Sequence, residues 1–151
     1  MTTYRNAMAL DSPDFVSLDK QLFPYSPWSA GQYKEEFAEM PRTRHFVVAL
    51  DDDKSIIGYA GILVPAPAVE ADILTVGVIA EHRGKGIARQ LIALITDFAI
   101  DRQAAAMMLE VKSDNVEAIG LYESLGYSRL NTRKDYFGSG LDALIMRKEL
   151  P

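Results

Sequence analysis

The sequence predicts an α/β fold in which a mixed, mostly antiparallel central sheet is flanked by helices. Two observations support this fold class. The hydrophobic period and the turn residues give the element order β-α-α-β-β-β-α-β-α-β-β, which suits a mixed sheet. No repeat, low-complexity tract or linker divides the 151 residues, so we expect one domain, residues 1–151, that buries roughly two thirds of its unfolded surface.

Composition excludes several classes of function. The chain has no cysteine and two histidines, so it lacks thiolate chemistry and we expect no metal site. A net charge of −5 argues against nucleic acid as a direct partner and favours a basic or amine-bearing substrate. No segment approaches the ~20 apolar residues of a membrane span, and the first residues form no secretory signal. We therefore expect a cytoplasmic protein with no membrane partner.

The N-terminal part should contain a short strand, a helix and an aromatic loop. Residues 3–7 fit a strand, and Ser12 with Pro13 provides a cap and a first-turn proline for a helix that ends near Leu22. Residues 23–28 contain two prolines and cannot be helical, yet they concentrate aromatic side chains where a linker is usually polar.

A second helix should follow this loop. Ser29 and Gln32 have the spacing of a capping box that opens a helix over residues 30–39, ended by Pro41. One flank of this helix is strongly acidic, through Glu35, Glu36 and Glu39.

Three strands are expected next. Residues 45–50 and 56–64 read as a hairpin around the acidic turn 51–54. The third strand begins near Glu70 and continues through the apolar run 73–79, in which Val76 and Val78 bracket Gly77. A glycine at this place predicts a bulge or a close backbone approach.

The third strand passes through a glycine-rich bend directly into a long amphipathic helix that starts at Ile87. Such a bend directs unpaired N–H groups and the positive end of the helix dipole at one point, which would bind a phosphate or pyrophosphate. A triphosphatase loop does not fit, because Lys85 precedes Gly86. A dinucleotide fingerprint does not fit either, since Arg89 occupies the place of its third glycine.

Three strands and a helix complete the chain. Residues 107–112 form a strand, and residues 113–115 supply the cap of a helix that runs to Leu125 and stops at Gly126. Residues 127–130 and 141–148 should be the final strands.

Glu110 and Tyr122 form a second group of chemical interest. A carboxylate in the apolar strand around Glu110 has its pKa raised by desolvation unless a charge compensates it, which suits a general base. The strand-loop-helix arrangement lets Tyr122 converge with it near the phosphate loop. Taken alone, Glu110 could be a salt-bridged strand residue and Tyr122 a core aromatic.

These residues resemble those of a known family. The hexamer Arg83 to Ala88 has the form R-x-x-G-x-A, which is similar to the acetyl-coenzyme A signature of the GNAT family of N-acetyltransferases. On its own the hexamer also fits a surface turn with basic side chains. The segments around Phe23-Pro24, Trp28-Ser29, Leu121 to Gly126, Arg133 to Phe137 and Asp142 to Met146 resemble the RimI branch, the N-terminal alanine acetyltransferases of a ribosomal protein.

The resemblance implies acetyl-coenzyme A as the donor, no metal, and direct transfer to a protein α-amine. It implies Glu110 as base, Tyr122 as acid, and the Val78 N–H, freed by the bulge, as the group that polarises the thioester. Cofactor binding would fall to Val76, Gly77, Val78, Arg83, Gly84, Lys85, Gly86, Ile87, Ala88, Arg89 and Asn115. Acceptor binding would fall to Tyr25, Trp28, Glu35 and Tyr136.

The expected partner is the basic N-terminal segment of a small-subunit ribosomal protein. The departures from the RimI pattern, such as an insertion in the aromatic loop, bear on the acceptor more than on the chemistry. Two alternatives stay open. One is acetylation of a small amine such as a polyamine or an antibiotic, and the other is a non-catalytic acyl-coenzyme A module.

Overall fold

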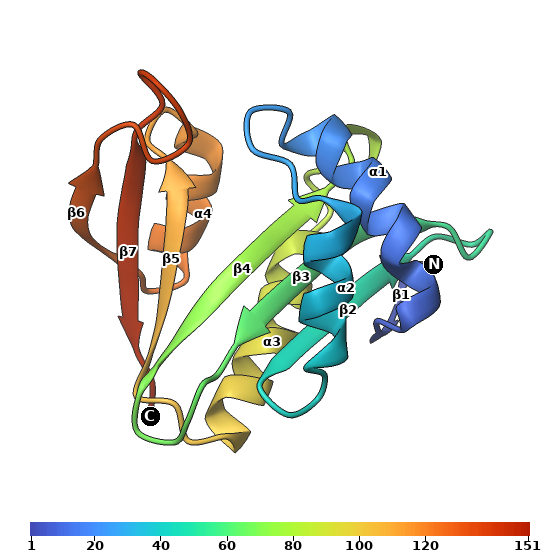
Figure 1. Cartoon of the computed structure of the whole chain (residues 1–151), viewed down its shortest axis with the longest axis horizontal. Coiled ribbons are helices and arrows are strands. Elements are labelled where there is room, and N and C mark those ends of the chain that lie inside the picture. Colours follow the sequence, from blue (N-terminus) through green and yellow to red (C-terminus); the bar gives the residue numbers. More distant parts are fainter.

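The computed structural model describes all 151 residues and shows one seven-stranded sheet with the order β1-β2-β3-β4-β5-β7-β6 (Figure 1). The strands are β1 (Thr3–Asn6), β2 (Arg44–Leu50), β3 (Ile56–Leu63), β4 (Glu70–Val78), β5 (Ala106–Lys112), β6 (Ser128–Arg133) and β7 (Ala143–Glu149). The helices are α1 (Ser12–Leu22), α2 (Ala30–Ala38), α3 (Ile87–Asp101) and α4 (Val116–Ser124), with short 3-10 helices η1 (Ala9–Asp11) and η2 (Ala80–His82). The predicted order of strands and helices is confirmed.

The sheet opens between β4 and β5. All other neighbours pair antiparallel, whereas β4 and β5 run parallel and pair only from Glu70 to Asp72 against Ala106 to Met108. Beyond this short ladder the two strands separate toward their carboxyl ends (Figure 1). Since α3 follows β4 and α4 follows β5, both helices begin at the open end.

Helices cover both faces of the sheet. On one face α1 and α2 enclose an aromatic core in which Phe15, Tyr33, Phe46 and Tyr59 are fully buried. On the other face α3 packs on β2, β3 and β4 through an aliphatic core that includes Leu91 and Ile95. None of the helices has the length and apolar character needed to cross a membrane.

One local prediction is wrong, and of the two alternatives given for Gly77 the close approach is the correct one. The N-cap of α1 is Asp11 and Ser12 is already helical, because η1 precedes α1 without a break and brings the chain in with helical dihedral angles. The bulge in β4 lies at Leu74, where the register against β3 shifts, and Gly77 is regularly paired with Tyr59. Gly77 is instead the site of a close approach, because an added Cβ would lie 2.9 Å from a methyl group of Leu22.

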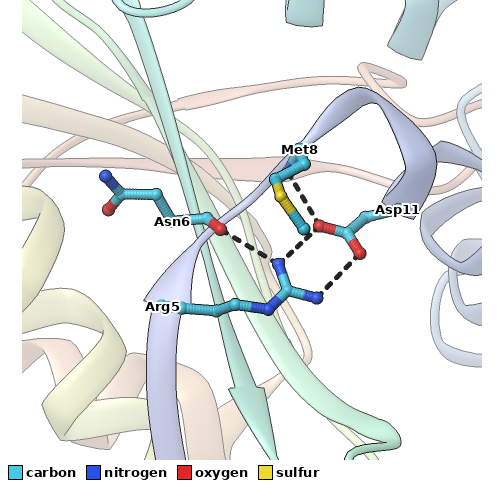
Figure 2. A network of polar contacts seen from close by, with 4 residues as sticks. All are labelled: Arg5, Asn6, Met8 and Asp11. Carbon is cyan, nitrogen blue, oxygen red and sulfur yellow. Dashed lines mark hydrogen bonds and ion pairs between the residues drawn. The ribbon is translucent and has the colours of Figure 1, made fainter.

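A partly buried ion pair fixes the N-terminal segment. The Arg5 guanidinium donates to both carboxylate oxygens of Asp11, at 2.7 and 2.9 Å, and the Met8 N–H donates to one of them at 2.8 Å (Figure 2). Asp11 is 6% exposed, so its charge depends on these donors. The hydrogen bonds from Arg5 are the main reason that the pKa of Asp11 lies below its ordinary value.

Replacing Asp11 with Asn should lower the free energy of unfolding by about 1–3 kcal/mol at pH 7, because a charge-assisted pair is lost. A lowered folded-state pKa gives a stabilisation that is complete above the unfolded value of about 3.9 and is lost as pH falls through the folded value. Urea unfolding should therefore show a difference between wild type and variant that shrinks below about pH 4. The exposed Asp53, replaced with Asn, serves as control, and a difference independent of pH would contradict the assignment.

Candidate active site

A cavity of about 500 Å³ lies at the open end of the sheet. The residues that line it come from the end of β4, the glycine-rich bend, the first turns of α3 and α4, and the aromatic loop. They include Val76, Gly77, Val78, Arg83, Gly84, Gly86, Ile87, Ala88, Arg89, Asn115 and Tyr122. Of the cofactor residues predicted from the sequence, Lys85 alone is not in this lining.

The bend exposes backbone donors to this cavity. Gly84 and Gly86 have φ angles of +77° and +80°, a left-handed conformation that favours glycine, and Gly86 is the N-cap of α3. A Cβ added at either position would meet nothing within 4 Å, so the space beside the loop is open. The first N–H groups of α3 have no partner inside the helix and form the positive end of its dipole. An anion such as a pyrophosphate would be stabilised here.

Two arginines of the predicted cofactor site also hold the loop in place. The Arg83 Nε–H donates to the Val78 carbonyl at 3.0 Å and so ties the loop to the end of β4. The Arg89 guanidinium donates to the Ser124 hydroxyl at 2.8 Å and links α3 to α4. Both side chains therefore also position the elements that line the cavity.

The Val78 N–H faces away from β3. The Ile79 N–H donates to the Ile57 carbonyl at 3.0 Å, and successive N–H groups of a strand point to opposite sides. The Val78 N–H therefore points toward the opening between β4 and β5. Its freedom, predicted from a bulge at Gly77, results from the separation of the two strands, since β5 pairs with β4 only as far as Asp72.

A second cavity, of about 360 Å³, adjoins the first. Glu110 of β5 lines it, together with Asp72, Thr75, Trp28 and Tyr136. The residues common to both cavities are Phe23, Tyr25, Val76, Lys112, Asn115, Ala118 and Tyr122. The predicted phenol, Tyr122, therefore lies where the two cavities meet, and the predicted carboxylate, Glu110, lines the second cavity.

Glu110 is half-buried, and burial is the main reason that its pKa is raised above the ordinary value. The Asp72 carboxylate raises the pKa of Glu110 further, and Arg133 opposes this rise. Asp72 pairs with Met108 in the parallel ladder, and Glu110 is two residues further along the same face of β5.

Sequence reasoning missed Asp72 and Arg133. Asp72 could have been found from the sequence, because it is a carboxylate within a predicted strand, as Glu110 is. The effect of Arg133 depends on how β6 pairs with β7, which local patterns do not reveal.

Tyr122 is buried, and it lines both cavities. Burial, reinforced by the neighbouring Tyr127, raises the pKa of Tyr122 well above its ordinary value. The phenol therefore stays protonated near neutral pH and can donate a proton or a hydrogen bond.

The aromatic loop covers the second cavity. Tyr25 and Trp28 both line this cavity, and the Tyr25 ring meets Phe137 edge-on at 5.3 Å between centroids. Tyr136, on the same segment as Phe137, completes the lining and packs edge-on against Phe137 at 4.9 Å.

Glu35 lies outside both cavities and lines a separate hollow beside Trp28. Glu35, which was expected to bind the acceptor, therefore lies apart from the cavity that contains Glu110. Tyr33 and Phe37 face the core, which turns Glu35 outward. Of the other two glutamates on this helix, Glu36 pairs with Arg44 and Glu39 with Arg42, so much of the acidic flank is neutralised.

The architecture defines a class of protein. A helix N-terminus with open backbone donors, a free strand edge beside it, and an adjoining cavity with a carboxylate and a phenol together suit transfer of a group from a phosphate-bearing carrier to a nucleophile. The acetyltransferase (GNAT) family model matches residues 10–127. The chain belongs to this family and is an acyltransferase.

Named relatives agree with this family. The N-alpha-acetyltransferase RimI of Mycobacterium tuberculosis is 36% identical over 92% of this chain and 87% of that protein. The ribosomal protein S18-alanine N-acetyltransferase of Escherichia coli is 26% identical over 97% of this chain, and its crystal structure superposes with a TM-score of 0.83 over 99% of this chain and 94% of that one.

Two other matches support less: one shows only that the fold is shared, and the other covers only part of a longer protein. Arabidopsis thaliana NAA60 in complex with acetyl-CoA gives a TM-score of 0.87 at 16% identity over 99% of both chains. An uncharacterised Mycobacterium leprae protein is 36% identical over 89% of this chain, which spans 37% of that protein. The predicted fold and enzyme class are confirmed.

Replacing Asp72 with Asn should lower the pKa of Glu110, because a like charge that faces it is removed. Carbon-detected NMR titration of the Glu110 carboxyl group measures this directly. The Asp53→Asn variant, altered in the distant β2–β3 turn, should leave the titration unchanged. An unchanged Glu110 titration in the Asp72 variant would show that the two carboxylates do not interact.

Proposed function

We propose that this protein transfers the acetyl group of acetyl-coenzyme A to the α-amine of a basic protein N-terminus, with alanine first, as in a ribosomal protein of the small subunit. The observation that carries the proposal is the junction of the two cavities at Tyr122, with Glu110 on one side and the anion-binding loop on the other. The names of the Mycobacterium tuberculosis and Escherichia coli relatives support the choice of a protein α-amine.

The first cavity has the features that the donor requires. The N–H groups of residues 84–89 would hold the pyrophosphate, and the open space beside Gly86 would admit it. The free edge of β4 from Val76 to Val78 would pair with the amides of the pantetheine arm, with Asn115 near its end. Acetyl-coenzyme A supplies an activated thioester whose carbonyl oxygen would accept from the Val78 N–H.

Glu110 would act as the general base and Tyr122 as the general acid. An α-ammonium has a pKa of about 7.7–8.0 and must lose a proton before it can attack, and Glu110 would accept this proton, directly or through a water. The neutral amine nitrogen then forms the amide bond and releases its second proton to solvent, while the bond from the carbonyl carbon to sulfur breaks. Tyr122 would give its proton to the departing thiolate and recover it from solvent.

The second cavity would bind the acceptor. Asp72 and Glu110 make its interior acidic, and no cation lies within 4 Å of either carboxylate. An incoming ammonium would compensate these charges. Tyr25, Trp28 and Tyr136 would hold the first residues of the acceptor, and attraction of its basic side chains would fall as salt screens it over roughly 10 Å at 0.1 M.

One observation favours a second candidate, a small amine as acceptor. The contact between Tyr25 and Phe137 joins the aromatic loop to the β6–β7 segment and narrows one side of the cavity. A polyamine or an aminated antibiotic would need less room than a peptide. The third alternative, a non-catalytic acyl-coenzyme A module, does not explain the placement of Glu110 and Tyr122. One assay of acetyl transfer under multiple-turnover conditions excludes or establishes this alternative.

Replacing Gly86 with Val should abolish measurable acetyl-coenzyme A binding in titration calorimetry. A β-branched side chain would enter the space beside the loop, and the positive φ would strain the turn by about 1–2 kcal/mol. Gly120→Val, on the exposed face of α4 with equally open space, is the control for the added volume. Unchanged affinity in a folded Gly86 variant would remove the donor assignment.

Glu110→Gln should lower the turnover number on the order of a hundred- to ten-thousand-fold near neutral pH. The loss should be smaller above pH ~8, where the amine is already largely neutral. Tyr122→Phe should lower turnover across the whole pH range. Tyr127→Phe is a matched control, since that buried hydroxyl has no hydrogen-bond partner. Near-normal turnover in both the Glu110 and Tyr122 variants would show that these two residues have a structural role and no catalytic one.

The acceptor is tested with three peptides and one polyamine. We expect acetylation of a peptide with free N-terminal alanine followed by arginines, little reaction with its N-terminally blocked form, and slower reaction with an acidic analogue. The Michaelis constant for this peptide should rise with ionic strength. Compared with wild type, it should be raised more by Asp72→Asn than by Glu35→Gln. Faster acetylation of spermidine than of any peptide would promote the small-amine alternative.

A further inference from the structure

Asp19, in the last turns of α1, is a buried carboxylate that the proposed chemistry does not use. It is 2% exposed and has no cation within 4 Å. Three donors point at it: the Tyr33 hydroxyl at 2.8 Å, the Tyr59 hydroxyl at 2.5 Å and the Trp28 N–H at 2.9 Å. A buried charge is costly unless it is hydrogen-bonded, so these donors are what allow a carboxylate at this position.

The three donors come from three different elements. Tyr33 belongs to α2, Tyr59 to β3 and Trp28 to the aromatic loop, while Asp19 itself lines the second cavity. Burial and the Asp19 charge raise the pKa of both phenols well above the ordinary value, which keeps them protonated as donors. The carboxylate therefore joins the helical layer, the sheet and the loop at one point.

The backbone of the loop makes few hydrogen bonds. Between residues 24 and 28 the other backbone hydrogen bond, from the Ser26 N–H to the Phe23 carbonyl, is a turn within the loop. The Trp28 N–H bond to Asp19 is the one that ties this stretch to another element. The Trp28 ring also packs on the Tyr33 ring at 4.9 Å, and the Tyr33 hydroxyl binds the same carboxylate. Asp19 thus holds the Trp28 backbone directly, and it holds the Trp28 ring indirectly through Tyr33.

We propose that Asp19 is a positioning residue for acceptor selection, which acts by holding Trp28 in the wall of the second cavity. The inference rests on the proposed function in one respect, because it assumes that the second cavity binds the acceptor. Asp19 and Trp28 do not line the first cavity, so the effect should separate acceptor from donor.

The test uses the fact that Trp28 is the single tryptophan of the chain. Its fluorescence reports the loop in the whole protein without any assumption about the acceptor. In Asp19→Asn, acrylamide quenching of Trp28 should increase, since the charge that organises the donors is gone. The Michaelis constant for the alanine-arginine peptide should rise about tenfold, which corresponds to loss of one charge-assisted hydrogen bond. The turnover number should fall less, and acetyl-coenzyme A affinity should be unchanged.

Asp11→Asn is the matched control. It removes another buried, hydrogen-bonded carboxylate near the N-terminus and costs folding free energy, but Asp11 lines neither cavity. It should leave Trp28 quenching and the peptide Michaelis constant unchanged. Equal effects in the two variants would overturn the positioning role, because a general loss of stability would then explain them.

If Asp19→Asn does not fold, Tyr59→Phe takes its place, since it removes the shortest hydrogen bond to the carboxylate and keeps the ring. It should increase quenching and raise the peptide Michaelis constant in the same direction. Unchanged quenching in the folded variants would overturn the proposal even if wild type acetylates peptides. Increased quenching, with a wild type that acetylates no peptide, would uphold the positioning of Trp28 and reject the acceptor assignment.

Discussion

The short parallel ladder between β4 and β5 is the constraint on which the rest of the structure depends. Because the strands pair only as far as Asp72, the sheet is continuous at one end and open at the other. The opening frees one edge of β4, and the helices that follow β4 and β5 both begin beside it. The chain thereby obtains unpaired backbone donors and two adjoining cavities within a single sheet. A fully paired sheet of the same sequence would leave no place for a ligand between the two strands.

The acidic side chains differ in what surrounds them, and this decides what each can do. Asp11 has an arginine partner and Asp19 has three neutral donors, so both are satisfied inside the protein. Asp72 and Glu110 are half-buried, face one cavity and have no close cation, so their charges are available to a cationic ligand. A negative net charge is therefore a poor guide to the binding surface. Location and pairing matter more, as the neutralised glutamates of α2 show.

Much of the candidate site could be predicted, for reasons that are local. The glycine-rich bend between a strand and an amphipathic helix requires left-handed backbone at Gly84 and Gly86, and neighbouring sequence alone indicates this. Glu110 and Tyr122 are twelve residues apart on consecutive elements, so their approach follows from one strand-loop-helix unit. Asp72, Arg133 and Asp19 were missed, because each acquires its meaning from elements distant in sequence. Glu35 was misplaced for the same reason.

The order of the elements and the class of loop followed from local sequence, because hydrophobic periodicity, capping residues and glycine conformation act over a few residues. The family followed from the resemblance of short motifs such as Arg83 to Ala88. The assembled fold sets where the sheet opens and leaves the Val78 N–H free, since β4 and β5 pair through residues 36 positions apart in the sequence. It also decided which carboxylates share a cavity. Burial and charge proximity are properties of the assembled fold, and they set the pKa of Glu110 through Asp72 and Arg133.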